Sequence, residues 1–326
     1  MRITLDKNKL LTSIIVFAIV IITANWTLYS STTPKPTPYN FLNNGISTRA
    51  AGLGGATVSF DNDGAGSFVN PALLNIDNNN NLNFTFLKHL LDINSGNLMY
   101  VFERTKYGVF AANVVYTNFG SFDYYNEDGQ KLPGSFTGNM VSISGSFATE
   151  IEERLHGGVS AKLIFNQLEE MSGFAVAIDA GLLYKLDDDR TNFGLSILNA
   201  GTELKRFSPS EKADVPLDVR IGFNHQLKGL PLNFNAGFNH LATGDNFGER
   251  FAYINIGGEL YFGDYVQVRL GFDNYVRKNF AIPQNRGLTG LSAGVGIVTD
   301  WFNFDYAISS VASNLYLHRF GVNLKL

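Results

Sequence analysis

The chain has 326 residues, of which 45% are hydrophobic, and its formal net charge is −4. It contains no cysteine, which excludes disulfide frameworks, thiolate zinc sites, iron–sulfur clusters and cysteine nucleophiles. The slightly acidic balance argues against a nucleic-acid-binding protein, because such proteins normally carry a basic stripe. Only 17% of the residues are charged, whereas glycine (33 residues) and phenylalanine (27 residues) are abundant. This composition favours an all-β structure with many turns.

Residues 1–24 have the pattern of a secretory signal peptide. Three basic residues near the start precede an apolar run at 10–23, which is shorter than the ~20 residues that a helix needs to cross a bilayer. We therefore predict export with cleavage near Ala24, and an uncleaved anchor is the alternative interpretation. Residues 25–38 are polar and rich in proline, which is typical of an extended linker.

Residues 39–80 differ from the linker before them and from the strands after them. They combine many apolar side chains with several glycines, among them Gly52, Gly54 and Gly55. A segment of this composition is too apolar to extend into water. We therefore expect it to fold against another part of the chain.

From residue 81 to the end, apolar residues alternate with polar ones at the period of a β-strand. Leu217, Val219 and Ile221, for example, alternate with Asp218 and Arg220. The pattern predicts fourteen strands, at residues 82–91, 96–104, 107–118, 137–149, 154–166, 173–186, 191–199, 217–227, 231–242, 251–262, 264–275, 289–300, 301–310 and 315–326.

The connections between these strands favour a membrane barrel over a soluble β-sandwich. The odd-numbered loops total about 70 residues and the even-numbered loops about 14, an asymmetry typical of outer-membrane barrels. Strands of about eleven residues, tilted by ~40°, rise ~27 Å and match the apolar band of such barrels. We predict that residues 81–326 form a transmembrane antiparallel up-and-down β-barrel. A sandwich remains the alternative, because both folds show the same alternation.

The lumen of the predicted fourteen-strand barrel is too wide to be filled by the side chains of its strands. Strand side chains alone fill a lumen only up to about eight strands. We therefore predict that residues 39–80 form an N-terminal hatch, or plug, inside the lumen. Arg49 has five hydrogen-bond donors, and we expect it to bridge a lumen carboxylate such as Asp218 or Glu259, with a solvated side chain as the alternative.

The predicted hatch also carries a family resemblance. The run from Ser47 to Ser59, the acidic pair that follows it and a later Asn-Pro-Ala resemble the opening signature of the PorV/PorQ family of outer-membrane barrels, which is related to the long-chain fatty-acid transporter fold. The residues that carry this hatch signature are Ser47, Arg49, Gly52, Gly54, Gly55, Asp61, Asp63, Asn70, Pro71 and Ala72. The short chain and the later motifs at 118–122, 128–129 and 134–136 are more similar to the PorQ branch than to PorV.

The resemblance implies a role for the chain. Members of this family work in the type IX protein secretion system, in the cell-surface complex that receives and attaches exported proteins. On this basis we predict a non-enzymatic scaffold in the bacterial outer membrane, with other proteins of that complex and membrane lipid as its partners. The alternative is a fatty-acid-transporter-like barrel that carries hydrophobic small molecules, with a pocket between hatch and wall. A diffusion pore is a third interpretation, which the predicted hatch disfavours.

Three long loops, at residues 119–136, 200–216 and 276–288, are candidate surfaces for partner proteins. They contain tyrosine, phenylalanine and arginine, which are enriched at protein interfaces. The candidate partner-binding residues are Phe122, Tyr124, Tyr125, Arg206, Phe207, Arg277 and Phe280. The alternative is that these loops only face water.

No motif predicts catalysis, a cofactor or a metal. Asp61 to Gly64 are similar to the start of a calcium loop, but Ala72 stands where the twelfth-position Glu would be. The five histidines have no i, i+3 or i+4 spacing for a metal. We also find no Ser–His pair placed for hydrolysis. The prediction is therefore a non-enzyme without cofactor.

Overall fold

The computed structural model describes residues 37–43, 47–61, 63, 65–74, 80–89, 92–209, 211–243, 247–281 and 286–326. The predicted signal peptide and nearly all of the predicted linker lie outside the described residues. Within the described part of the chain, no helix is both long enough and apolar enough to span a bilayer.

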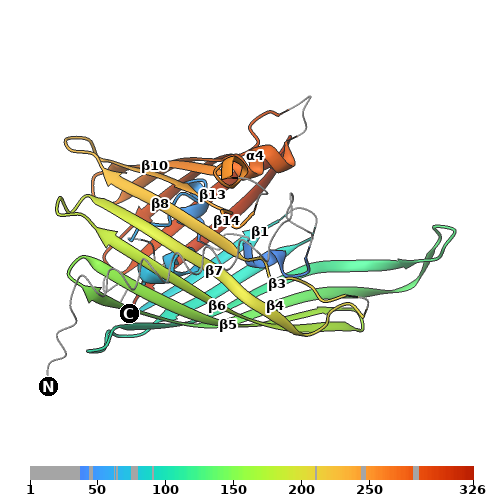
Figure 1. Cartoon of the computed structure of the whole chain (residues 1–326). Helices are drawn as coiled ribbons and strands as arrows, with labels where there is room; N and C mark the ends of the chain where they lie inside the picture. Colours follow the sequence, from blue (N-terminus) through green and yellow to red (C-terminus); the bar gives the residue numbers. More distant parts are fainter. Residues whose placement is uncertain are drawn as a thin grey trace, which may run out of the picture.

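Fourteen antiparallel strands form one closed barrel, and each strand pairs with its neighbours in sequence (Figure 1). This architecture confirms the predicted up-and-down barrel. The strands are β1 (Asn81–Lys88), β2 (Asn94–Val101), β3 (Val109–Tyr125), β4 (Lys131–Glu152), β5 (Leu155–Leu168), β6 (Met171–Lys185), β7 (Thr191–Lys205), β8 (Asp218–Gln226), β9 (Leu232–Phe238), β10 (Ile254–Phe262), β11 (Val266–Asp273), β12 (Leu291–Val298), β13 (Phe302–Ala312) and β14 (Leu315–Lys325).

The first and last strands close the sheet. β1 pairs with β14 from Asn81 opposite Lys325 to Lys88 opposite His318. The Asn80 side-chain amide donates to the Leu326 carbonyl at 2.6 Å, and the Leu326 amide donates to the Asn80 carbonyl at 2.9 Å. Closure leaves no unpaired edge along these strands, which is what a sheet surrounded by lipid requires.

Polar and apolar side chains are distributed in the opposite sense to a soluble protein. Large apolar residues on the strands are exposed on the outside, such as Leu270 (66% exposed) and Ile178 (60% exposed). Polar residues of the same strands are buried in the lumen, including Asn235, Glu259 and Arg269. A soluble sandwich buries its apolar face instead. The distribution is therefore that of a barrel with an apolar outer surface.

The prediction of a loop at residues 119–136 is wrong for most of its length. There β3 and β4 continue beyond the barrel as a long two-stranded hairpin (Figure 1). Phe122 pairs with Phe136 across the hairpin, and their ring centroids lie 5.4 Å apart. Aromatic cross-strand pairs of this kind stabilise a hairpin where the sheet has ended. The sequence prediction stopped the strands at the bulge between Asn118 and Ser121.

Two other predicted loops also contain regular structure. β7 continues to Lys205, so the connection between β7 and β8 spans residues 206–217 rather than 200–216. The connection between β11 and β12 holds the helix α4 (Asn274–Phe280). Asp273 caps that helix, because its carboxylate accepts from the Tyr275 amide at 2.8 Å and the Val276 amide at 3.2 Å. A further short helix, α3 (Phe247–Arg250), lies between β9 and β10.

Candidate functional site

A segment before the barrel lies inside its lumen (Figure 1), and we call residues 37–43, 47–61, 63 and 65–74 the lumenal segment. It forms four short elements, namely η1 (Asn40–Asn43), α2 (Thr48–Gly52), η2 (Gly66–Phe68) and η3 (Pro71–Leu73). Two signature residues cap these turns. The Ser47 hydroxyl accepts from the Ala50 amide, and the Asn70 side chain accepts from the Ala72 amide, both at 3.0 Å.

Arg49 ties the lumenal segment to the wall through a buried ion pair. Of the two carboxylates predicted for it, the structure pairs Arg49 with Glu259 on β10, with its Nε 2.8 Å from Oε2. Burial acts to lower the pKa of Arg49, but the Glu259 carboxylate outweighs burial and raises that pKa above its usual range. The Arg49 guanidinium also lies 4.5 Å from the centroid of the Phe60 ring. Arg49 is therefore charged and held on two sides.

The same carboxylate joins a chain of charges along the wall. Arg269 on β11 donates from its Nε to Glu259 Oε2 at 2.6 Å. The Arg269 guanidinium also contacts Asp305 on β13 and Gln267. Glu259 and Arg269 are essentially unexposed. The network links α2 with three strands, and each buried charge in it faces an opposite one, as burial requires.

Two further contacts place the acidic residues of the signature. Ser47 donates its hydroxyl hydrogen to Asp63, whose other carboxylate oxygen accepts from the Ala65 amide at 3.1 Å. Burial raises the pKa of the Asp63 carboxyl. Asp61 pairs instead with Lys185 on β6. Both carboxylates thus serve contacts within the fold, and among the described residues no group of three acidic or histidine side chains is arranged for a metal ion.

Glycines in the wall let the backbone of the lumenal segment lie directly against the strands. A Cβ at Gly257 would lie 2.6 Å from the Leu53 carbonyl oxygen, so only glycine fits there. The position of Gly54 requires glycine for two reasons: its φ is +65°, and a Cβ there would lie 2.6 Å from the Phe272 nitrogen. Other wall glycines in contact with the segment are Gly158, Gly181, Gly194, Gly222, Gly271, Gly294 and Gly321.

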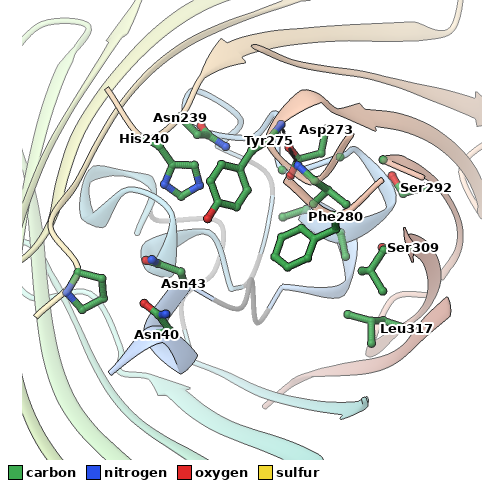
Figure 2. Close-up of a pocket in the computed structure, with 18 of the residues that line it drawn as sticks. Asn40, Asn43, Asn239, His240, Asp273, Tyr275, Phe280, Ser292, Ser309 and Leu317 are labelled. Carbon is green, nitrogen blue, oxygen red and sulfur yellow. Dashed lines mark hydrogen bonds between the residues drawn. The ribbon is translucent and has the colours of Figure 1, made fainter. Parts of the chain in front are cut away.

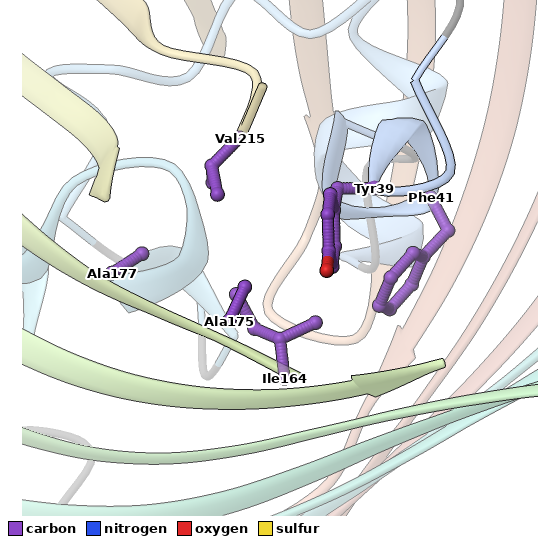
Figure 3. Packing of buried hydrophobic residues seen from close by; sticks show 6 residues of the cluster. All are labelled: Tyr39, Phe41, Ile164, Ala175, Ala177 and Val215. Atoms are coloured by element: carbon purple, nitrogen blue, oxygen red, sulfur yellow. The ribbon is translucent and has the colours of Figure 1, made fainter. Parts of the chain in front are cut away.

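The first residues of the lumenal segment, 37–43, form a strap across the wall at β5 and β6 (Figure 3). Tyr39 and Phe41 pack on Ile164, Ala175 and Ala177, and Val215 covers them from the β7–β8 connection.

The strap is also held by Glu203 on β7. The Tyr39 hydroxyl donates to a Glu203 carboxylate oxygen at 2.8 Å. The same carboxylate accepts from the Phe207 and Ala213 amides, each at 2.8 Å. Burial, followed by Glu203, raises the pKa of Tyr39, so this phenol keeps its proton. One carboxylate therefore fixes both the strap and the β7–β8 connection.

A cavity of about 700 Å³ lies between the lumenal segment and the wall (Figure 2). Its floor includes Ala50, Ala51, Gly54 and Gly55, and the strap contributes Asn40 and Asn43. The remaining lining comes from the connections and strand ends on the side of the long loops. Its apolar members include Val215, Leu217, Val276, Phe280, Leu291, Val311 and Leu317. The volume is in the range of small-molecule sites.

The charged groups at the cavity wall are engaged with protein partners. Arg220 donates from its Nε to Asp218 at 2.7 Å, and a second nitrogen of its guanidinium lies 2.7 Å from the same oxygen. His240 Nδ1 lies 3.3 Å from Asp218 as well. Arg319, which is 7% exposed, donates to the Ser309 hydroxyl at 3.2 Å. The carboxylate of Asp273 caps α4. The cavity lining therefore mixes apolar side chains with polar and charged ones, and among the latter Arg220 is paired with a carboxylate.

The structure scatters the predicted partner-binding residues over three places. Phe122, Tyr124 and Tyr125 lie on the projecting hairpin, and the Tyr124 hydroxyl donates to Glu169 at 2.7 Å. Arg206 and Phe207 follow β7.

The other two predicted partner residues lie in α4, beside the cavity. Arg277 donates to the carbonyls of Arg286, Gly287 and Thr289, at 3.2, 2.9 and 3.2 Å, and so organises its own loop. Phe280 lines the cavity.

Sequence reasoning missed the residues that shape the cavity, above all His240 and Tyr275. Their ring centroids lie 4.3 Å apart, although they come from different connections. Neither residue belongs to a motif, and no local sequence pattern predicts a contact between two residues that are 35 positions apart. A usable signal was Asp273 before an apolar–basic stretch, which indicates a helix that starts just before the predicted loop 276–288.

Comparison with known proteins by sequence gives no match, either to a protein-family model or to a curated protein. Solved structures do match. The toluene transporter TbuX of Ralstonia pickettii aligns with a TM-score of 0.54 at 13% identity, over 86% of this chain and 97% of TbuX. The toluene transporter TodX of Pseudomonas putida gives 0.56 at 13% identity, over 86% and 96%. A Pseudomonas aeruginosa FadL homologue gives 0.53 at 10% identity, over 90% and 100%. The chain thus shares the fold of these outer-membrane barrels.

Proposed function

We propose that the protein is an outer-membrane channel that takes up hydrophobic small molecules from outside the cell. The observation that carries this proposal is the cavity of about 700 Å³ on the long-loop side of the lumenal segment, whose lining includes apolar side chains such as Leu217, Phe280 and Leu317. The fold shared with two toluene transporters and a FadL homologue supports the same function. The proposed location is the bacterial outer membrane, with the long loops outside.

The lumen below the cavity argues against a general diffusion pore. There the lumenal segment lies against wall glycines such as Gly257, and Arg49 is paired with Glu259. Water-filled pores need an open lumen. In the proposed function the segment acts as a hatch, and selectivity comes from the cavity above it.

The test is uptake by Gram-negative cells that lack a hydrophobic-compound channel of their own. Cells that express the protein should accumulate radiolabelled naphthalene faster than cells with an empty vector. Ala242→Trp fills the cavity, because Ala242 lines it, and should return uptake to the vector level. Ala112→Trp is the matched control, since Ala112 is exposed on the outside of β3 and should leave uptake unchanged. Equal uptake by all four strains would contradict the proposal.

A second candidate function is a scaffold in the type IX secretion system, which the resemblance of the hatch signature implies. The observation that favours it is the β3–β4 hairpin, which projects well beyond the barrel (Figure 1). Phe122 is 41% exposed and Tyr125 61% exposed on this hairpin. Transport of a small molecule gives no evident use for such an extension, whereas exposed aromatic side chains suit a protein partner.

The scaffold is tested by pull-down from detergent-solubilised outer membranes of the native organism. If the hairpin docks proteins of the attachment complex, the wild-type chain recovers them and the triple variant Phe122→Ala, Tyr124→Ala, Tyr125→Ala does not. The matched control is a triple alanine variant of the equally exposed Glu127, Asp128 and Gln130 at the tip. Recovery of the same proteins by both variants would remove the hairpin from the interface.

A further inference from the structure

Two of the polar side chains in the lining of the cavity, Tyr275 and His240, lie next to each other. Figure 2 shows Tyr275 and His240 side by side, with the Tyr275 hydroxyl directed into the cavity and the Phe280 ring nearby. The Tyr275 and His240 ring centroids lie 4.3 Å apart, and those of Tyr275 and Phe280 lie 6.2 Å apart. Within the described part of the chain, the Tyr275 hydroxyl has ring contacts around it but no hydrogen-bond partner. A half-buried hydroxyl in this position is available to a ligand.

The neighbours of His240 determine what its ring offers. Its Nδ1 lies 3.3 Å from the buried carboxylate of Asp218, which favours the tautomer with the proton on this nitrogen. Nε2, on the other side of the neutral ring, is left as an acceptor. Burial lowers the pKa of His240 and raises that of Tyr275, so both groups are uncharged at neutral pH. The cavity therefore presents one O–H donor and one nitrogen acceptor next to each other.

We infer that the cavity takes an uncharged, ring-containing molecule that carries a hydroxyl group, with Tyr275 and His240 as the residues that recognise this hydroxyl. The inference rests on the proposed function and narrows its substrate class. A ligand hydroxyl accepts a hydrogen bond from the Tyr275 hydroxyl and donates one to His240 Nε2, which a hydrocarbon cannot do. The rings of Tyr275, His240 and Phe280 supply faces and edges for an aromatic body.

A carboxylate fits this pair less well. An ionised carboxylate is an acceptor only, so it leaves His240 Nε2 unmatched. Arg220 in the cavity wall is already paired with Asp218. The buried carboxylate of Asp218 and the half-buried carboxylate of Asp273 also lie at this side of the cavity. At the Tyr275–His240 pair the geometry therefore favours a hydroxyl over an anion and over a plain hydrocarbon.

Three probes with one ring skeleton separate these possibilities, namely naphthalene, 2-naphthol and 2-naphthoate. Binding is measured to the full chain in lipid nanodiscs, as the excess over nanodiscs without protein. We expect 2-naphthol to bind most tightly. Tyr275→Phe keeps the ring and removes the hydroxyl, so it should weaken 2-naphthol binding about fivefold, the effect of one neutral hydrogen bond, and leave naphthalene binding unchanged.

Phe280→Leu is the matched control in the same helix, because it alters an apolar wall and no polar atom. It should weaken naphthalene and 2-naphthol by the same factor. Equal binding of naphthalene and 2-naphthol by the wild type, tightest binding of 2-naphthoate, or an equal loss for both ligands in Tyr275→Phe would overturn the inference and leave the proposed function standing. Binding of none of the three probes would overturn both.

Discussion

The lumen of this barrel has two levels that are built in different ways. On the lower level the lumenal segment lies against wall glycines, and its one buried arginine, Arg49, forms an ion pair with Glu259. On the upper level the wall and the strap leave a cavity of about 700 Å³ with a phenol hydroxyl directed into it. We propose that close packing and paired charges close the lower level, whereas the open space and the Tyr275 hydroxyl of the upper level bind a ligand. Substitutions that affect one level and spare the other test this division.

The largest effect is expected from the buried ion pair of the lower level. Arg49→Met leaves Glu259 with one partner fewer and should lower the free energy of unfolding by about 3 to 5 kcal/mol. Lys185→Met is the matched control, because Lys185 also joins the segment to the wall, through Asp61, but both side chains are partly exposed. Lys185→Met should lower the free energy of unfolding by less than about 1 kcal/mol. Urea unfolding of the barrel in lipid vesicles measures both, and equal losses would contradict the central role of Arg49.

A smaller effect is expected from the glycines beneath the segment. Gly257→Ala places a methyl group against the Leu53 carbonyl and should lower the free energy of unfolding by about 1 to 3 kcal/mol. Gly258→Ala, one residue on, points to the other face of the sheet and meets only a Leu232 methyl at 3.5 Å. That control should change stability little. The same urea titration distinguishes them, and a Gly257 variant as stable as the Gly258 variant would show that the segment is not seated on the wall.

The smallest effect is expected on the upper level, where the loss of an isopropyl group changes binding rather than folding. Leu317→Ala removes part of the apolar cavity wall and should weaken naphthalene binding about fivefold, since the side chain is only partly buried. Leu163→Ala removes the same group from the outer face of β5 and should leave binding unchanged. Nanodisc binding compares the two, and identical affinities would place the ligand outside this cavity.

The sequence predicted the barrel well because its signal is local. Alternation such as that around Val219 and the contrast between long and short loops are visible residue by residue, and both follow from strand geometry. The hairpin was missed because a bulge at Gly120 interrupts the alternation while the strand pairing resumes beyond it. The cavity was missed because it depends on contacts such as that of His240 with Tyr275, which follow from the folded connections and not from any local pattern.

The resemblance and the structure point to different functions for the same fold. The hatch signature, with Ser47 and Asn70 as helix caps and Arg49 as the link to the wall, explains how the lumenal segment is held. These roles are structural and fit a transporter as well as a scaffold. The proposed transport rests on the cavity, and the proposed scaffold would use the projecting hairpin.

Closure of the lumen by the lumenal segment is tested most directly by conductance in planar bilayers. The full chain is compared with a variant that lacks residues 39–72, after a heat-dependent shift on gels has shown that each forms an assembled barrel. We predict that the variant conducts ions steadily while the full chain stays closed. Equal conductance of the two assembled barrels would contradict it.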